Sequence, residues 1–170
     1  ITTAFKKNRC PDDVLETATE SMTKLNQGAS QAAQTCAASA ATDITGFGLA
    51  GHTTEMAKAS GVQMVIELDA LPILPGVAAL ISQGHHTRAN ATNRNGIESS
   101  MRIEGDPDPV DMDIVFDPQT SGGLLVSIAA SQADAFIASC KQAGTESTAV
   151  IGEVRKRGAE SQDPFLILRG

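Results

Sequence analysis

The chain has 170 residues, a length that supports one domain with a substantial core and is short for two. Its residues are 41% hydrophobic and 19% charged, with a formal net charge of -7 and a pI of about 4.8. This balance argues against nucleic-acid-binding proteins, since no basic field would attract phosphate backbones, and no apolar run approaches the length of a membrane span.

The cysteine pattern predicts the cellular location of the chain, and its first residue predicts that the chain is processed or partial. Cys10, Cys36 and Cys140 are widely spaced and form no C-x-x-C pair, which argues against a disulfide framework or a zinc site. A reducing cytoplasm is therefore the expected location, and no secretory signal opens the chain. The chain begins with Ile1 rather than Met, so we expect it to be processed or to be a piece of something longer.

The first sixty residues predict helices. Pro11-Asp12-Asp13 starts a helix, with Leu15, Ala18, Met22 and Leu25 at helical spacing and Gly28 as its stop. A second helix is expected to begin in the Ala-rich stretch ASQAAQTCAASAA. The sequence leaves open whether AATDI forms a short strand. A third helix is expected from Phe47 to about Ser60, closed by Gly61.

The rest of the chain predicts strands with helices between them. Residues 62–68 alternate as a half-buried strand does, and GVAALISQ is a short helix ending at Gly84. Residues 85–111 are polar and nearly aperiodic, which predicts a long loop, mobile rather than functional. The remaining strands are expected at DIVF, LLVSIA, STAVIGEV and PFLILR, with a helix from Ser131 to Gly144 and a turn at RGAESQD. The pattern predicts a mixed sheet covered by helices, in one domain.

The stretch ATDITGFGLAGH, residues 41–52, contains a G-x-G-x-x-G pattern. A dinucleotide-binding site would need a strand before it and an acid about 20 residues later, where Glu67 and Asp69 stand. Asp43 argues against this site, because a bare carboxylate repels a pyrophosphate. A carboxylate beside a phosphate is tolerable with a cation between them, and Mg²⁺ is held in this way.

Spacing alone leaves a structural alternative open for this stretch. Thr42 or Asp43 could cap the following helix while the glycines permit a tight turn. The second glycine-rich stretch, DPQTSGG at residues 117–123, has the same two interpretations. Asp117 and Thr120 could bind a cation or a phosphate, but tying down a turn is the favoured interpretation, with Gly122 and Gly123 allowing close approach.

The histidines carry no metal-binding spacing. His52 falls within the third predicted helix, where a lone histidine is more often structural than a ligand. His85 and His86 are expected to be a solvated pair. No nucleophile elbow supports a hydrolase.

The two long motifs resemble a known family. ATDITGFGLAGH is similar to the T-D-[VI]-T-G-F-G-L-x-G-H motif of selenophosphate synthetase, also called selenide, water dikinase. FDPQTSGGLLVS resembles the second C-terminal signature of that family. ITTAFKK, LDALPILPGV and ATNRN resemble further family segments, so that the resemblance covers essentially the whole chain.

The resemblance implies a fold, a reaction and a division of labour. The implied fold is α+β, the α/β sandwich with a mixed sheet that forms the C-terminal domain in the aminoimidazole ribonucleotide synthetase-like superfamily, here spanning residues 1–170. The implied reaction makes selenophosphate, AMP and phosphate from ATP, selenide and water with Mg²⁺. The catalytic residue and most of the ATP site belong to an N-terminal domain, so the isolated chain is expected to be inactive, and the full-length protein to be a homodimer.

The resemblance also implies roles for individual residues. Asp43 would be a Mg²⁺ ligand, and no residue of this chain would be catalytic. Thr45, Gly46 and Gly48 would shape the loop facing the phosphates, whereas the Asp117, Thr120, Gly122 and Gly123 loop would be structural. The alternatives are another ATP-using member of the superfamily and a non-catalytic assembly module.

Overall fold

Helices and short strands alternate along the chain, and the computed structural model describes residues 1–158, 160 and 162–170. The helices are α1 (Thr2–Lys6), α2 (Asp12–Thr23), α3 (Gln27–Thr35), α4 (Gly48–Ser60), α5 (Val77–Ser82), α6 (Arg88–Ile97), α7 (Pro109–Phe116) and α8 (Ala133–Gln142). Single 3₁₀ turns lie at Leu68–Ala70, Glu98–Ser100 and Ala130–Gln132. The strands are β1 (Ala40–Asp43), β2 (Val62–Glu67), β3 (Met101–Glu104), β4 (Leu124–Ser127), β5 (Gly152–Lys156) and β6 (Leu166–Arg169).

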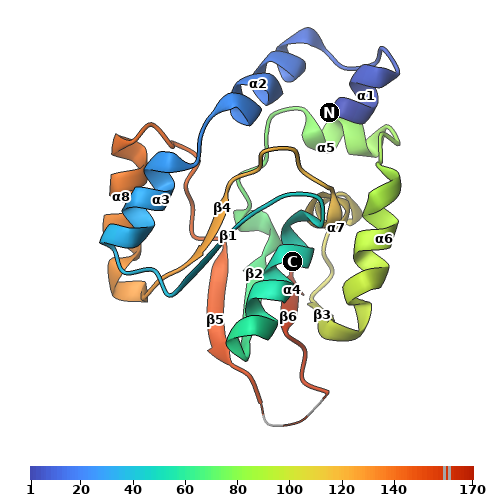
Figure 1. The fold of residues 1–170 in the computed structure, drawn as a ribbon. Helices are drawn as coiled ribbons and strands as arrows, with labels where there is room; N and C mark the ends of the chain where they lie inside the picture. The colour runs from blue at the N-terminus through green and yellow to red at the C-terminus, as the bar shows by residue number, and fades with distance from the viewer. Residues whose placement is uncertain (159, 161) are drawn as a thin grey trace.

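A four-stranded mixed sheet in the order β3-β6-β2-β5 forms the base of the fold. β6 runs parallel to both β2 and β3, whereas β5 is antiparallel to β2. α4 lies in front of this sheet in Figure 1, and α4 and α7 pack on the same face. The predicted α+β class, with a mixed sheet covered by helices, is confirmed.

The core on that face consists of apolar side chains from α4, α7, β2 and β6. Phe116 and Val115 of α7 and Leu166 and Leu168 of β6 are fully buried, and Ala50 of α4 contacts them across the layer. Burying side chains of this size stabilises a fold by about 1.5–3 kcal/mol each. This cluster therefore fixes where α4 begins relative to the end of α7.

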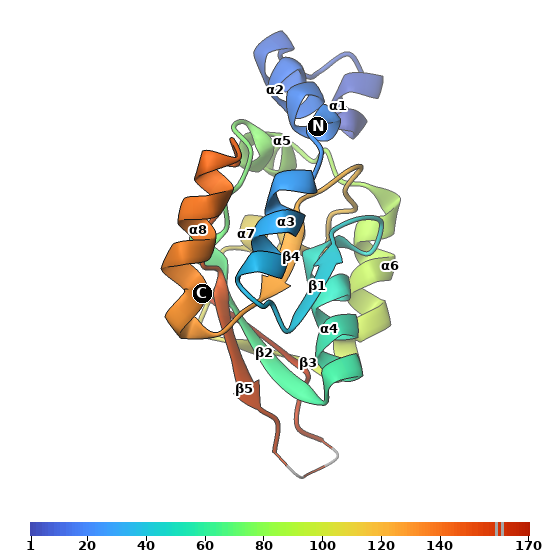
Figure 2. The ribbon, with the colours of Figure 1, turned by 60° about the vertical axis from the view of Figure 1, so that its left-hand side comes forward.

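In the part of the chain that the structure describes, a second, smaller β-layer has no strand pairing with the four-stranded sheet. β1 and β4 form an antiparallel two-stranded ladder in which Asp43 lies opposite Leu124. α3 and α8 lie side by side at the left of Figure 1 and pack small side chains, mainly alanine and cysteine, against β4. α1 and α2 project at one end of the molecule (Figure 2).

Several predicted helix boundaries are confirmed. α2 follows Pro11 and carries Asp12 and Asp13 in its first turn, and α4 ends at Gly61, whose φ of 66° is left-handed. The stop predicted at Gly28 is wrong, because α2 ends at Thr23 and Gly28 lies in α3. There a Cβ on Gly28 would come within 2.6 Å of the Ala143 side chain, so glycine serves helix packing.

Residues 85–111 are not a long loop, and that prediction is wrong. They form α6, β3 and the start of α7. Thr87 caps α6 by accepting a hydrogen bond from the Asn90 N–H at 3.3 Å. Helical periodicity was weak here because α6 uses polar side chains for its tertiary contacts.

The strand predicted at DIVF is also wrong, because residues 113–116 end α7. Asp108 accepts a hydrogen bond from the Val110 N–H at 2.8 Å, and Pro109 occupies the first turn. The strands predicted at residues 124–129 and 164–169 exist over shorter ranges, and the strand left open at residues 40–44 forms as β1. The strand predicted at residues 147–154 is displaced toward the C-terminus, because β5 begins only at Gly152 and extends to Lys156. The turn predicted at RGAESQD includes residues 159 and 161, which lie outside the described residues.

β2 is more deeply buried than its alternating pattern predicts. Met64, Val65 and Ile66 are consecutive and all buried, because β2 lies between β5 and β6. Within the described residues, no helix combines the length and the apolar character that crossing a bilayer requires.

Candidate functional site

Two loops that are far apart in the sequence meet at one end of the β1–β4 ladder. The first, residues 44–48, connects β1 to α4, and the second, residues 117–123, connects α7 to β4. Together they are called the paired loops below. The Ile44 N–H donates to the Gly123 carbonyl at 2.9 Å, and the Gly122 N–H donates to the Ile44 carbonyl at 3.2 Å. The structure thus joins the two motifs into one unit.

The backbone of Thr45 is fixed from both sides. Its carbonyl accepts hydrogen bonds from the N–H groups of Gly48 and Gln119, each at 3.0 Å. These two hydrogen bonds fix the Thr45 carbonyl at the point where the two loops meet.

Two of the glycines are required by this packing. Gly48 has a φ of 69°, and a Cβ there would lie 2.9 Å from the backbone of Phe116. At Gly122 a Cβ would come within 2.3 Å of the Ile44 carbonyl oxygen. Real Cβ atoms do not approach backbone so closely. Glycine therefore lets α4 pack on the end of α7 at Gly48 and lets the two loops touch at Gly122.

The other two glycines of the paired loops have open space around them. A Cβ on Gly46 or on Gly123 would meet no atom of the described residues within 4 Å, and neither glycine has a left-handed φ. The Gly46 carbonyl accepts a hydrogen bond from the Asn93 side chain of α6 at 2.9 Å, which holds this exposed turn in place. The fold leaves the side of the loop at Gly46 accessible to a ligand.

Asp43 ends β1 with its carboxylate exposed. It borders an open hollow of about 740 Å³ between α3 and β1, which Leu25 and Leu124 also line. Neither Asp43 nor Thr42 caps α4: the helix follows Phe47 without a side-chain cap, and the Asp43 carboxylate has no hydrogen bond or ion pair with the described part of the chain. The structural alternative for these two residues is therefore wrong.

A magnesium ion would find one carboxylate here and few other ligands. No group of three or more His, Cys, Asp or Glu side chains that could hold a metal occurs among residues 1–158, 160 and 162–170. Mg²⁺ is commonly bound by one or two carboxylates together with phosphate oxygens and water. The exposed carboxylate of Asp43 is a donor of this kind.

The topology argues against a dinucleotide site. β1 precedes the glycine loop and α4 follows it, as the fingerprint demands. However, β1 pairs antiparallel with β4 and lies outside the sheet that contains β2, so β1, α4 and β2 do not form the required parallel unit.

His52 contacts the first loop, which the sequence did not reveal. Its Nε2 lies 3.0 Å from the Thr45 hydroxyl, and its Nδ1 lies 3.2 Å from a Glu55 carboxylate oxygen. The Phe47 ring packs on it with centroids 5.5 Å apart, and His52 is only 9% exposed. The available signal was the spacing of Thr45, His52 and Glu55 around one helix start.

The second loop is anchored by Asp117. Its carboxylate accepts a hydrogen bond from the Thr87 hydroxyl at 3.3 Å, next to the end of α7. Burial raises the pKa of Asp117, and the hydrogen bond from Thr87 opposes this rise. Thr120 is exposed and bonds to nothing in the described part of the chain. The pattern fits the structural role expected of Asp117, and leaves that of Thr120 a prediction.

His85 and His86 are not simply a solvated pair. The His86 Nδ1 lies 3.4 Å from an Asp113 oxygen. The Nδ1 of His85 is buried without a partner in the described residues, and burial lowers the pKa of His85, as do Lys7 and Arg9. Both histidines lie outside the paired loops.

The comparison with protein families decides the family. A family described as "AIR synthase related protein, C-terminal domain" matches residues 3–162. The chain belongs to this family. The match includes β1, α4, α7 and β4, so both members of the paired loops lie within the family domain.

Three curated relatives of the chain share the name "Selenide, water dikinase". The chain is 42% identical over 161 residues to "Selenide, water dikinase" of Citrifermentans bemidjiense, covering 93% of the chain and 45% of the relative. It is 34% identical over 158 residues to the protein of the same name from Clostridioides difficile, with 93% and 45% covered. The Caldanaerobacter subterraneus protein of that name is 39% identical over 134 residues, with 79% and 39% covered. The chain thus spans less than half the length of these relatives.

Proposed function

We propose that this chain is the C-terminal domain of a selenide, water dikinase and that Asp43 is one ligand of the Mg²⁺ that accompanies ATP. The observation that carries the proposal is the Asp43 carboxylate, which is exposed and has no bond to the described part of the chain. It directly precedes the loop that leads to the uncapped start of α4. The name shared by the relatives and the likeness of both motifs support the same reaction.

The role assigned to this chain is to position the cation and the phosphates. Phosphoryl transfer depends mainly on placing cations and phosphates, and a bound Mg²⁺ would neutralise charge on the phosphate oxygens. Asp43 would hold that cation at the end of β1. The open side at Gly46 and the start of α4, which has no side-chain cap, would face the phosphates.

One carboxylate cannot supply both the full set of Mg²⁺ ligands and the catalytic group that the reaction needs. The remaining Mg²⁺ ligands and the catalytic residue would come from an N-terminal domain, as the family resemblance implies. The 170-residue chain alone is therefore expected to bind Mg-ATP weakly and to release no AMP. The proposal includes a cytoplasmic, homodimeric full-length enzyme.

The test is the substitution Asp43→Asn in the full-length protein that contains this chain. Selenide-dependent release of AMP from ATP is expected to fall by about 100-fold or more, and the Mg²⁺ concentration for half-maximal activity to rise. The substitution keeps the size of the side chain, and Asp43 is exposed, so unfolding should not occur at a lower denaturant concentration.

The matched control is Asp106→Asn, a second exposed carboxylate without a partner in the described residues. It is expected to retain full activity. Equal activity and equal Mg²⁺ dependence in wild type, Asp43→Asn and Asp106→Asn would refute the metal role and favour a structural module. ATP cleavage that does not depend on selenide would point to another ATP-using member of the superfamily.

A further inference from the structure

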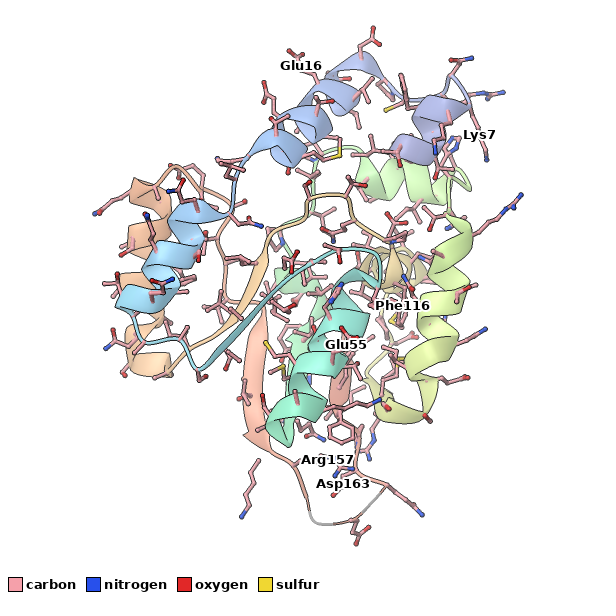
Figure 3. All side chains as sticks on the ribbon, in the orientation of Figure 1. Lys7, Glu16, Glu55, Phe116, Arg157 and Asp163 are labelled. Carbon is pink, nitrogen blue, oxygen red and sulfur yellow. The ribbon has the colours of Figure 1, made fainter. Side chains whose placement is uncertain are left out.

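The side chain of Thr45 is held by a chain of two hydrogen-bonding partners. His52 links the other two side chains: its Nδ1 lies 3.2 Å from the Glu55 carboxylate, and its Nε2 lies 3.0 Å from the Thr45 hydroxyl. Glu55 and His52 are one helical turn apart on α4, and Thr45 precedes the helix. Figure 3 shows Glu55 on α4, away from Glu16 on α2.

The chemistry of these groups determines where the hydrogens are. An ionised carboxylate only accepts hydrogen bonds, so the Nδ1 facing Glu55 carries a hydrogen. In a neutral imidazole the other nitrogen, Nε2, is then an acceptor. The Thr45 hydroxyl must therefore donate its single hydrogen to Nε2.

A hydroxyl that has donated its hydrogen offers only lone pairs to a further ligand. We propose that His52, oriented by Glu55, is a positioning residue that makes the Thr45 hydroxyl an acceptor, so that this side of the loop receives a cation or a cation-bound water rather than a phosphate oxygen. The inference rests on the proposed function for the identity of the cation as Mg²⁺. It refines the phosphate-facing role first expected of Thr45.

The surroundings of His52 support positioning over stability as the role of the pair. The Glu55 side chain is 61% exposed, and a hydrogen bond to a carboxylate so exposed to water adds little to folding. The imidazole itself is covered by the Phe47 ring and is 9% exposed. Its orientation is therefore restricted by packing, while Glu55 selects the tautomer.

The first measurement is the tautomer of His52 in the ¹⁵N-labelled chain, read from long-range ¹H–¹⁵N correlations. The expected result is a hydrogen on Nδ1 and none on Nε2 in wild type. Glu55→Ala should move the hydrogen to Nε2, whereas Glu55→Gln, whose amide oxygen still accepts from Nδ1, should preserve the wild-type form. A hydrogen on Nε2 in wild type, or no change in Glu55→Ala, would overturn the proposal.

The second measurement is a titration with Mg²⁺ alone and with inorganic phosphate alone, followed by the amide shifts of residues 43–48. Glu55→Ala and Thr45→Val should weaken the response to Mg²⁺ by about fivefold, the value of one hydrogen bond. Glu55→Gln should respond like wild type, which separates positioning from the loss of a negative charge. Glu16→Ala, on exposed α2 surface, is the matched control.

The possible results distinguish this inference from the proposed function. An equal Mg²⁺ response in all variants, or none in wild type, would overturn the role of Thr45 as an acceptor, and so would a stronger response to phosphate than to Mg²⁺. If both measurements agree with expectation while the full-length protein shows no selenide-dependent AMP release, the dikinase proposal fails and the role of His52 stands.

Discussion

The paired loops have a packed side and an open side, and both use glycine. On the packed side, Gly48 and Gly122 touch backbone so closely that no other residue fits. On the open side, Gly46 and Gly123 meet nothing within 4 Å. Glycine therefore has two different roles in the paired loops. On the packed side it lets the two loops come together, and on the open side it leaves space beside the exposed carboxylate of Asp43.

The largest expected effect comes from the packed side, with Gly48→Ala. A left-handed φ of 69° disfavours alanine, and its Cβ would press on the Phe116 backbone at 2.9 Å. The free energy of unfolding, measured by urea denaturation, should fall by about 2–4 kcal/mol.

Gly61→Ala is the control for the backbone conformation alone. Gly61 has a similar φ of 66° with nothing within 4 Å, so alanine there should cost only about 1 kcal/mol. Equal losses in the two variants would show that the contact between α4 and α7 does not require a glycine.

A smaller effect is expected within the second loop, from Gly122→Ala. Its Cβ would lie 2.3 Å from the Ile44 carbonyl oxygen and push the loops apart, at a cost of about 1–3 kcal/mol. Hydrogen exchange should also accelerate at the Ile44 amide, which donates to Gly123.

Gly123→Ala tests the open side of the same loop. It should change the free energy of unfolding by less than about 0.5 kcal/mol, because nothing lies near the new methyl group. If Gly123→Ala destabilises the protein as much as its neighbour does, the division into two sides is wrong.

The same two sides differ in how well the sequence predicted them. The motif residues and the helix α4 were predictable, because local periodicity and turn chemistry indicate them, whereas the sequence left the strand at β1 open. The contact between Ile44 and Gly122 was not, since it depends on an antiparallel pairing of segments about eighty residues apart. The partnership of Thr45, His52 and Glu55 was also missed, although all three lie within one short stretch.

The polar stretch before the second loop shows why composition misled. Residues 85–111 were expected to be a loop, yet α6 forms there and its Asn93 side chain donates to the Gly46 and Phe116 carbonyls. A helix whose polar side chains bond to the backbone of neighbouring elements has no clear apolar stripe. The cap at Thr87 and the Asp108-Pro109 start of α7 were the local signals that could have revealed both helices.

The smallest expected effect concerns the charge that anchors the packed side, in Asp117→Asn. Burial raises the pKa of Asp117 in the folded protein above its unfolded value. The stability that this carboxyl contributes is then complete below its unfolded pKa and is lost as the pH rises through the folded pKa. Asn has no such titration, so the stability of the variant relative to wild type should rise between about pH 3 and pH 7.

Thr87→Val tests the cause of this pH dependence from the other direction. The Thr87 hydroxyl donates to Asp117 and favours its charged form, so its removal should raise the folded pKa further and steepen the loss of stability toward neutral pH. Because Thr87 also caps α6, the variant should be less stable at every pH, and the informative quantity is the difference between acidic and neutral unfolding free energies. If the free energy of unfolding changes with pH in the same way in wild type and in both variants, Asp117 is hydrated. The packed side of the paired loops then ends before Asp117.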